Sequence, residues 1–163
     1  MLQTFAAEPG DFRHMIESPI GTLTLTERAG AIVSLDWGKH GTQSATPLLR
    51  RAAEQLAAYF AGRLKAFDLP LDPAGTEFQQ RVWRRMDEIP YGQLMTYGAL
   101  AKATRSSARA VGGACGRNPI PIILPCHRVL AADGRLTGYS GAGGVETKRL
   151  LLKLEGSLEP ELA

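Results

Sequence analysis

The segment from Asn118 to Val129 constrains the fold more than any other part of this 163-residue chain. It reads Asn-Pro-Ile-Pro-Ile-Ile-Leu-Pro-Cys-His-Arg-Val, so three prolines surround a short apolar run. Such a run predicts a buried extended segment or an edge strand, because proline fixes its own backbone and keeps the preceding residue out of the helical region. Cys126, His127 and Arg128 follow the last proline directly. We therefore expect a thiol, an imidazole and a guanidinium at the end of a rigid, buried track.

Cys126 is a candidate nucleophile. A thiol with a pKa of about 8.5 is mostly protonated at neutral pH, and a neighbouring base or positive charge favours the reactive thiolate. His127 is the candidate base and Arg128 the candidate positive charge. The alternative is a buried structural cysteine, because free cysteine is among the most buried residue types. The Cys-His pair alone does not decide between these two interpretations.

Composition indicates an ordinary globular protein of one domain or two small ones. Hydrophobic residues make up 44% of the chain and charged residues 21%, which is the usual range. There is no run of about 18 apolar residues that predicts a membrane span, and the N-terminus has no secretory signal pattern. The two cysteines, Cys115 and Cys126, are expected to be free thiols in a reducing cytosol. No Cys or His pair has metal-ligand spacing, so no metal is predicted.

Positive charge is concentrated in one part of the chain. The net charge is only +3, but the stretch from Ile89 to Ala132 contains basic residues and no acidic one. Its basic residues are Lys102, Arg105, Arg109, Arg117 and Arg128. This asymmetry indicates a surface for a polyanion, and the alternative is a solvated basic face.

The first half predicts a small antiparallel sheet followed by a helix. Residues 12–18, 22–26 and 31–37 have strand character with short turns between them, which is typical of a meander. Residues 22–26 alternate between threonine and leucine, so this strand is expected to be half-buried. An amphipathic helix is predicted from residue 48 to 60, with Pro47 at its start. The Pro/Gly cluster at residues 72–75 predicts a boundary, giving domains 1–74 and 75–157 and a tail at 158–163.

The second half begins with a helix that Thr76 and Gln79 open as a capping box. Two short helices follow, at residues 97–103 and 108–116, and the four-residue connection between them gives a helix-turn-helix pattern. The second of these helices consists of small residues apart from Arg109. It can approach a nucleic-acid groove closely, or it can pack tightly in the core.

The C-terminal part predicts a hairpin, a loop and a last helix. Asp-Gly at 133–134 predicts a turn between strands at 129–131 and 135–137. The glycine-rich loop at 138–144 has no lysine of a phosphate-binding loop. The final helix, 146–154, is expected to bury Leu150, Leu151 and Leu154.

Several motifs of the second half occur together in one order. They are Gly75-Thr-Glu-Phe-Gln, Ile89-Pro-Tyr-Gly, Thr96-Tyr97, Ala108-Arg-Ala-Val-Gly, Asn118-Pro, Pro125-Cys-His-Arg-Val, Gly138-Tyr-Ser-Gly and Lys148. From Gly75 to Gly156 the chain closely resembles the 6-O-alkylguanine-DNA alkyltransferases. The first half looks like the more variable N-terminal domain of that family. The resemblance implies an α+β fold, with a sheet-and-helix domain followed by a mostly helical, winged-helix-like domain that contains the cysteine track.

The resemblance also implies a chemistry. Cys126 would attack the alkyl carbon on the guanine oxygen, and the stable thioether would make the protein act once, without a cofactor. His127 would act as base through a water and Glu155 would orient it, and we call Cys126, His127 and Glu155 the relay. Tyr97 would press on the target nucleotide and donate a proton to the departing guanine. Asn118 would brace the junction between the helix at residues 108–116, which would be the recognition helix, and the cysteine.

The implied partner is double-stranded DNA that contains alkylated guanine. The damaged base must leave the stack to react, and Arg109 would fill its place while the small-residue helix lies in the minor groove. The implied DNA contacts also include Thr96, Tyr97, Ala108, Ala110, Gly112 and Arg117. The implied pocket is lined by Pro121, Val129, Tyr139 and Ser140, with Lys148 nearby. A cytoplasmic monomer without membrane contact is expected, nucleoid-associated in a prokaryote or nuclear in a eukaryote, and cooperative binding is left open.

Two features differ from the family pattern. The loop between Tyr139 and Lys148 is about two residues longer than usual, which affects pocket shape. Cys115 lies inside the recognition helix, where we interpret it as a packing residue. The sequence argues against three other functions. A binding-only damage sensor would lack Cys126, and a helix-turn-helix regulator would need more base-reading side chains than Arg109. A cysteine hydrolase would need an oxyanion-hole motif, and the sequence shows none.

Overall fold

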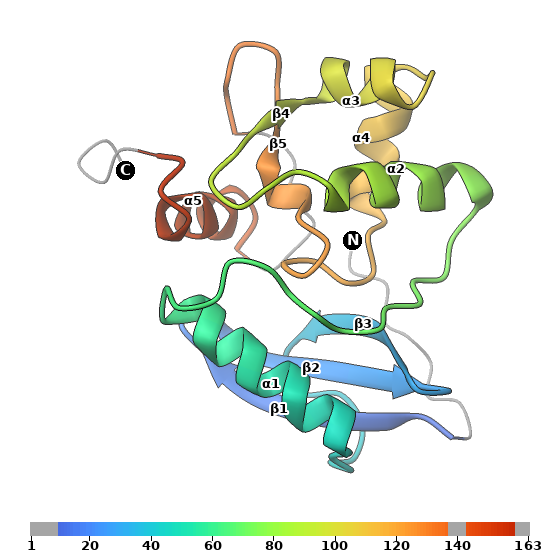
Figure 1. Ribbon diagram of the computed structural model, residues 1–163, viewed down its shortest axis with the longest axis vertical. Coiled ribbons are helices and arrows are strands. Elements are labelled where there is room, and N and C mark those ends of the chain that lie inside the picture. The colour runs from blue at the N-terminus through green and yellow to red at the C-terminus, as the bar shows by residue number, and fades with distance from the viewer. Residues whose placement is uncertain (1–9, 137–142, 159–163) are drawn as a thin grey trace. The chain divides into compact units, whose positions relative to one another are not determined.

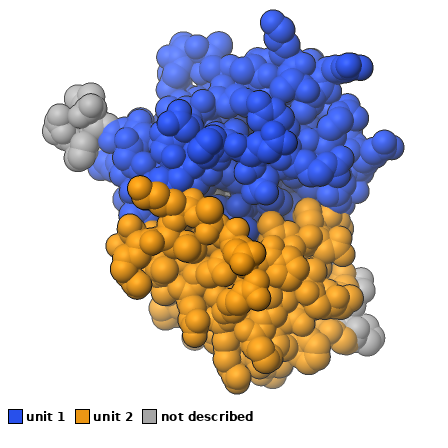
Figure 2. Space-filling view, viewed as in Figure 1, with its two compact units in different colours: residues 1, 75–163 blue, residues 2–74 orange. Residues whose placement is uncertain are grey.

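The computed structural model describes residues 10–136 and 143–158. The chain divides into two compact units between Ala74 and Gly75, at the Pro/Gly cluster (Figures 1 and 2). No helix within the described ranges is both long enough and apolar enough to cross a membrane. Of the predicted C-terminal tail, only Leu158 belongs to the described part.

The N-terminal unit is a three-stranded antiparallel sheet with one helix against it (Figure 1). Strands β1 (Phe12–Ser18), β2 (Gly21–Arg28) and β3 (Ala31–Trp37) pair in chain order, so the predicted meander is confirmed. Helix α1 (Pro47–Phe60) begins after Thr46, whose side chain accepts a hydrogen bond from the Leu49 amide. The core of the unit consists of Leu23, Leu25, Ile32, Leu35, Leu49, Leu56 and Tyr59.

Strand β2 is buried on both faces, so the prediction of a half-buried strand was wrong. Thr24 and Thr26, which alternate with the core leucines, are as buried as those leucines. The segment after β3 explains this for Thr24, because its hydroxyl donates to the Gly38 carbonyl and accepts from the His40 amide. A threonine whose hydroxyl is satisfied in this way can be buried at little cost.

The C-terminal unit begins with helix α2 (Glu77–Asp87), which has the predicted capping box of Thr76 and Gln79. The indole nitrogen of Trp83 donates to the Ala114 carbonyl at 2.9 Å, and this hydrogen bond ties α2 to helix α4 (Ala108–Gly116). The bond is buried, so it fixes the position of α4 within the unit.

Helices α3 (Tyr97–Ala103) and α4 form the predicted helix-turn-helix (Figure 1). Thr96 caps α3 by accepting from the Ala99 amide, and Ser107 caps α4 by accepting from the Ala110 amide. Thr104 ends α3, and its buried hydroxyl donates to the Leu100 carbonyl. These side chains satisfy the backbone groups that every helix end leaves unpaired.

The proline-flanked segment is buried as predicted, but it is a compact turn and not an extended strand. The Leu124 amide donates to the Ile120 carbonyl at 2.9 Å, which folds the apolar run back on itself. Ile122 has a φ of 75°, in the left-handed region that a β-branched residue rarely adopts. The short strand β5 (Val129–Leu130) pairs in parallel with β4 (Met95–Thr96).

The C-terminal elements correct two further predictions. A turn is present at residues 131–134, where the Gly134 amide donates to the Ala131 carbonyl, but the described residues 135–136 are not a strand. Helix α5 (Val145–Leu154) buries Leu151 as predicted, but Leu150 is 52% exposed and Leu154 is partly exposed. Its buried face contains Lys148, Leu151, Leu152 and, just beyond the helix, Glu155. This spacing of three and four residues places Leu150 on the opposite face.

Candidate active site

Cys126 is the first residue of a short 3₁₀ helix, η1 (Cys126–Arg128), directly after Pro125. Only 4% of its surface is exposed. The Cys126 amide donates to the Leu124 carbonyl at 2.9 Å, so the compact turn holds the cysteine backbone. This places a free thiol in the interior of the unit.

Asn118 connects the end of α4 to this turn. Its side-chain nitrogen donates to the Leu124 carbonyl at 2.8 Å, and its side-chain oxygen accepts from the Ile120 amide at 2.9 Å. Burial raises the pKa of the Cys126 thiol, while the Asn118 side chain and the Lys148 ammonium act in the opposite direction. The resting site therefore holds a protonated thiol whose ionised form has two stabilising neighbours.

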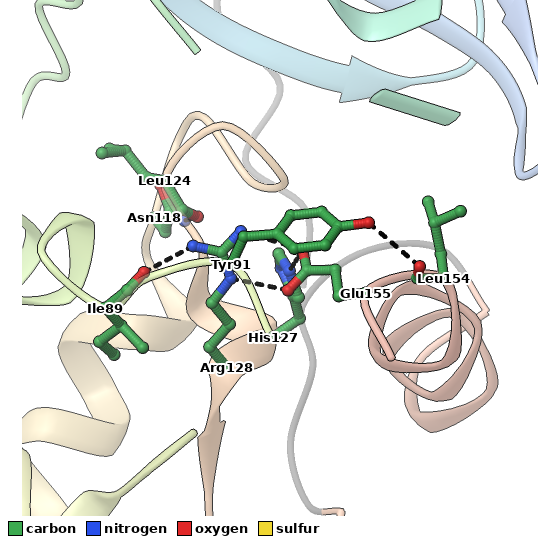
Figure 3. Close-up of polar contacts among 8 residues, drawn as sticks. All are labelled: Ile89, Tyr91, Asn118, Leu124, His127, Arg128, Leu154 and Glu155. Atoms are coloured by element: carbon green, nitrogen blue, oxygen red, sulfur yellow. Dashed lines mark hydrogen bonds and ion pairs between the residues drawn. The ribbon is translucent and has the colours of Figure 1, made fainter. Parts of the chain in front are cut away.

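His127 and Glu155 form a buried hydrogen-bonded pair (Figure 3). The Nε2 atom of His127 lies 2.7 Å from a carboxylate oxygen of Glu155, and neither side chain is exposed. Since a carboxylate accepts, Nε2 carries the hydrogen and Nδ1 of a neutral ring carries the lone pair. Nδ1 is buried and has no hydrogen-bond partner among the described residues. Burial lowers the pKa of His127, so the ring is a neutral base.

Arg128 does not serve as the positive charge for the thiol, which corrects that expectation. Its Nε and Nη2 atoms donate to the two oxygens of Glu155 at 2.8 and 3.0 Å, and Nη1 donates to the Ile89 carbonyl at 2.6 Å. Its guanidinium also lies over the ring of Tyr91, 5.8 Å from the ring centre (Figure 3). The structure thus makes Arg128 a partner of the carboxylate, a role that the sequence did not reveal.

Lys148 supplies the cation near the thiol. It is fully buried, its ammonium donates to the Val129 carbonyl at 2.6 Å, and it lies 5.7 Å from the centre of the Tyr97 ring. Burial lowers the pKa of Lys148, and the two cysteines oppose this shift. A buried ammonium beside a thiol is a usual way of favouring a thiolate.

The residues expected to contact DNA gather on the helix-turn-helix. Ala108, Arg109 and Arg117 are exposed, and Ala110, Gly112, Thr96 and Tyr97 are partly exposed. A Cβ atom added at Gly112 or at its exposed neighbour Gly113 would meet nothing within 4 Å. A partner molecule can therefore approach the backbone of α4 closely on its outer face, where Arg109 is the large side chain.

Pro121 and Val129 are buried in the compact turn and in β5. Tyr139 and Ser140 lie outside the described residues.

Cys115 is buried with its sulfur 3.9 Å from the Met86 sulfur, and burial raises the pKa of its thiol to about 12. This packed, protonated thiol has the character of a core residue. Among the residues described, no group of three or more His, Cys, Asp or Glu side chains could hold a metal ion.

Comparison with known proteins identifies the class. Residues 77–157 match the 6-O-methylguanine DNA methyltransferase DNA binding domain, and residues 12–73 match the ribonuclease-like domain of the same methyltransferases. A methylated-DNA–protein-cysteine methyltransferase of Methanosarcina acetivorans is 47% identical over 153 residues, which cover 88% of this chain and 97% of that protein. A Mycobacterium tuberculosis protein of the same name is 47% identical over 154 residues, covering 89% and 92%. These likenesses extend over both units.

Solved structures agree with this. Mycobacterium tuberculosis OGT in complex with DNA has a TM-score of 0.80 and 45% sequence identity, and the match covers 93% of this chain and 97% of that one. The chain belongs to the methylated-DNA–protein-cysteine methyltransferase family.

Proposed function

We propose that this protein repairs 6-O-alkylguanine, mainly 6-O-methylguanine, in double-stranded DNA by moving the alkyl group irreversibly to Cys126. The observation that carries the proposal is the buried free thiol of Cys126, which the chain places directly before the hydrogen-bonded His127–Glu155 pair. Membership of a family that transfers methyl groups from DNA to protein cysteine supports the same reaction.

The step balances as a nucleophilic substitution. The Cys126 sulfur forms a bond to the alkyl carbon as the bond from that carbon to the guanine oxygen breaks. The thiol proton passes through a water to Nδ1 of His127, which Glu155 then stabilises as a cation. The electron pair of the broken bond stays on the guanine, and the Tyr97 hydroxyl protonates the leaving base. The Tyr97 phenolate then regains a proton from water, and the His127 cation returns one to water. The thioether cannot be hydrolysed, so each molecule acts once and needs no cofactor.

The DNA side of the proposal rests on the outer face of α4. The base is rotated out through the minor groove, at an expense of a few kcal/mol, and Arg109 fills the space that it leaves. The DNA backbone is contacted closely by Ala108, Ala110, Gly112 and Thr96, and Arg117 contacts a phosphate. Such contacts carry little sequence information, as a repair protein requires.

The pocket assignments follow from the same proposal. Pro121 and Val129 line the site that receives the base, and the Lys148 ammonium donates to the Val129 carbonyl. We expect the protein to act as a monomer in the cytoplasm, or in the nucleus of a eukaryote.

The test is the intact mass of the protein after mixing with a duplex that contains one 6-O-methylguanine, followed by peptide mapping. A stoichiometric gain of one methyl group on Cys126 is expected. An unchanged mass with tight binding to that duplex would instead indicate a damage sensor. A methyl group on any other residue would refute the assignment of the nucleophile.

A further inference from the structure

We propose that Arg128 and Tyr91 are positioning residues of the alkyl transfer, which fix the Glu155 carboxylate in the one orientation that keeps His127 a base toward Cys126. The inference rests on the proposed function. Both residues lie outside the relay: Arg128 directly follows His127, and Tyr91 lies 35 residues before Cys126.

The Arg128 guanidinium leaves Glu155 little choice of orientation. Its fork occupies both carboxylate oxygens, through Nε at 2.8 Å and Nη2 at 3.0 Å, and a bidentate contact of this kind fixes the plane of the carboxylate. The oxygen that accepts from Nη2 also accepts from Nε2 of His127 at 2.7 Å. The carboxylate can therefore present only an acceptor to His127, which selects the ring form whose Nδ1 lone pair is free.

The guanidinium is itself held from two further sides. Its Nη1 donates to the Ile89 carbonyl at 2.6 Å, and its face lies against the Tyr91 ring. The Tyr91 hydroxyl donates to the Leu154 carbonyl at 3.1 Å, one residue before Glu155 (Figure 3). Tyr91 thus ties the segment after α2 to the end of α5 and covers the ion pair. Gly92, at a φ of 81°, lets this segment approach, since a Cβ there would lie 3.3 Å from the Glu155 carbonyl.

The charges around the Glu155 carboxylate determine what losing the Arg128 guanidinium would do. His127 and Arg128 face Glu155 from η1, and Tyr91 faces it from the segment after α2. Asp87 of α2 acts on Arg128, and Lys148 of α5 acts on His127. Arg128 donates to both oxygens of the carboxylate, so removing it takes away the bidentate cation that balances this buried negative charge. Such a charge takes up a proton easily, and a protonated carboxyl no longer fixes the ring.

The experiment compares pH–rate profiles of three variants with 6-O-benzylguanine as a free base, which reports transfer without DNA binding. In Arg128→Met we expect at least a tenfold slower transfer at neutral pH and an acidic limb moved to higher pH by about 1–3 units. Arg128→Lys keeps the charge but not the fork, so its acidic limb should stay near the wild-type position while its maximum rate falls. Tyr91→Phe keeps the ring and loses the tie to Leu154, and an intermediate loss of rate is expected.

Arg81 gives a matched control in the same unit. Its guanidinium also lies over an aromatic ring, that of Phe78 at 5.2 Å, and donates to a backbone carbonyl, that of Thr104 at 3.3 Å. Arg81→Met should leave the profile unchanged. Thermal unfolding identifies folded variants, and Arg128→Lys and Tyr91→Phe carry the test if Arg128→Met does not fold.

The outcomes separate this inference from the proposed function. A wild-type protein that gains no alkyl group would overturn the proposed function first. An active wild type whose Arg128 variants fold and give the profile of Arg81→Met would overturn the inference alone. A shifted acidic limb in Arg128→Met, together with an unshifted limb but a lower maximum rate in Arg128→Lys, would establish the positioning role, because the lysine restores the charge and not the fork.

Discussion

Replacing Asn118 with alanine tests whether a single amide holds the cysteine in place. The change removes the acceptor of the buried Ile120 amide, which is then left unpaired at an expense of about 1–3 kcal/mol. It also removes one of the two donors to the Leu124 carbonyl. This carbonyl still accepts from the Cys126 amide, so losing the second hydrogen bond reduces stability by only about 1 kcal/mol. Together these predict a loss of about 2–4 kcal/mol in the free energy of unfolding, and 3 kcal/mol corresponds to about 6–12 °C in the unfolding midpoint.

The assay is chemical or thermal unfolding, with the rate of transfer to a free benzylated base measured well below the midpoint. Transfer should slow even in fully folded protein, since Asn118 favours the ionised form of Cys126. Gln79→Ala is the control, because Gln79 also accepts a backbone amide, that of Thr76 at 2.9 Å, but at an exposed helix end. If Asn118→Ala loses no more stability than Gln79→Ala and reacts at the wild-type rate, the reasoning is refuted.

Four further outcomes follow from the same structure. Cys126→Ala should abolish the methyl gain in a mass assay and leave DNA binding nearly intact; loss of both would make Cys126 structural. Arg109→Ala should slow repair in a duplex by tenfold or more, on the order of the few kcal/mol that unstacking requires, and should leave reaction with the free base unchanged; equal loss on both substrates would reject its role in base flipping. Glu155→Gln should slow transfer and move its pH–rate profile to higher pH, because the neutral amide no longer stabilises the His127 cation that forms when Cys126 gives up its proton, so the pKa of the thiol rises; an unchanged profile would remove Glu155 from the relay. Stability should fall on both sides of neutrality. Below pH 6.5 the unfolded chain takes up a proton that buried His127, with its lowered pKa, does not. Above pH 9.0 the unfolded chain releases the proton that Cys115, with its pKa raised to about 12, retains. A flat stability profile in urea titrations from pH 5 to 10 would contradict both assignments.

Local sequence signals predicted the elements of this fold well. The capping box of Thr76 and Gln79, Pro47 at the start of α1 and Thr96 before α3 each act within one helical turn, so the sequence alone defines them. The signals failed where distant residues decide. Thr24 alternates with leucine like a solvent-facing residue, yet the segment at Gly38 and His40 buries it.

The site divides along the same line. Cys126 and His127 were candidates from their setting among prolines, and Glu155 and Lys148 became candidates through the family resemblance. The role of Arg128 was misjudged, because adjacency in sequence suggested the thiol as its partner. In a 3₁₀ turn successive side chains point in different directions, and the partner of Arg128 is instead a carboxylate 27 residues away. Tyr91 carries no local signal of its function, since its contacts depend on the end of α5.

The open space around Gly112 and Gly113 has a consequence for how this protein can change over time. Glycine inside a helix reduces stability by about 1 kcal/mol relative to alanine, and alanine would meet no atom at either position. A more stable version of the chain is therefore one substitution away at two adjacent sites. If α4 must approach DNA as closely as proposed, those methyl groups would weaken binding. Selection for thermostability alone would then favour variants that are more stable but repair DNA less well. A screen for stabilised variants therefore needs repair activity as a second criterion.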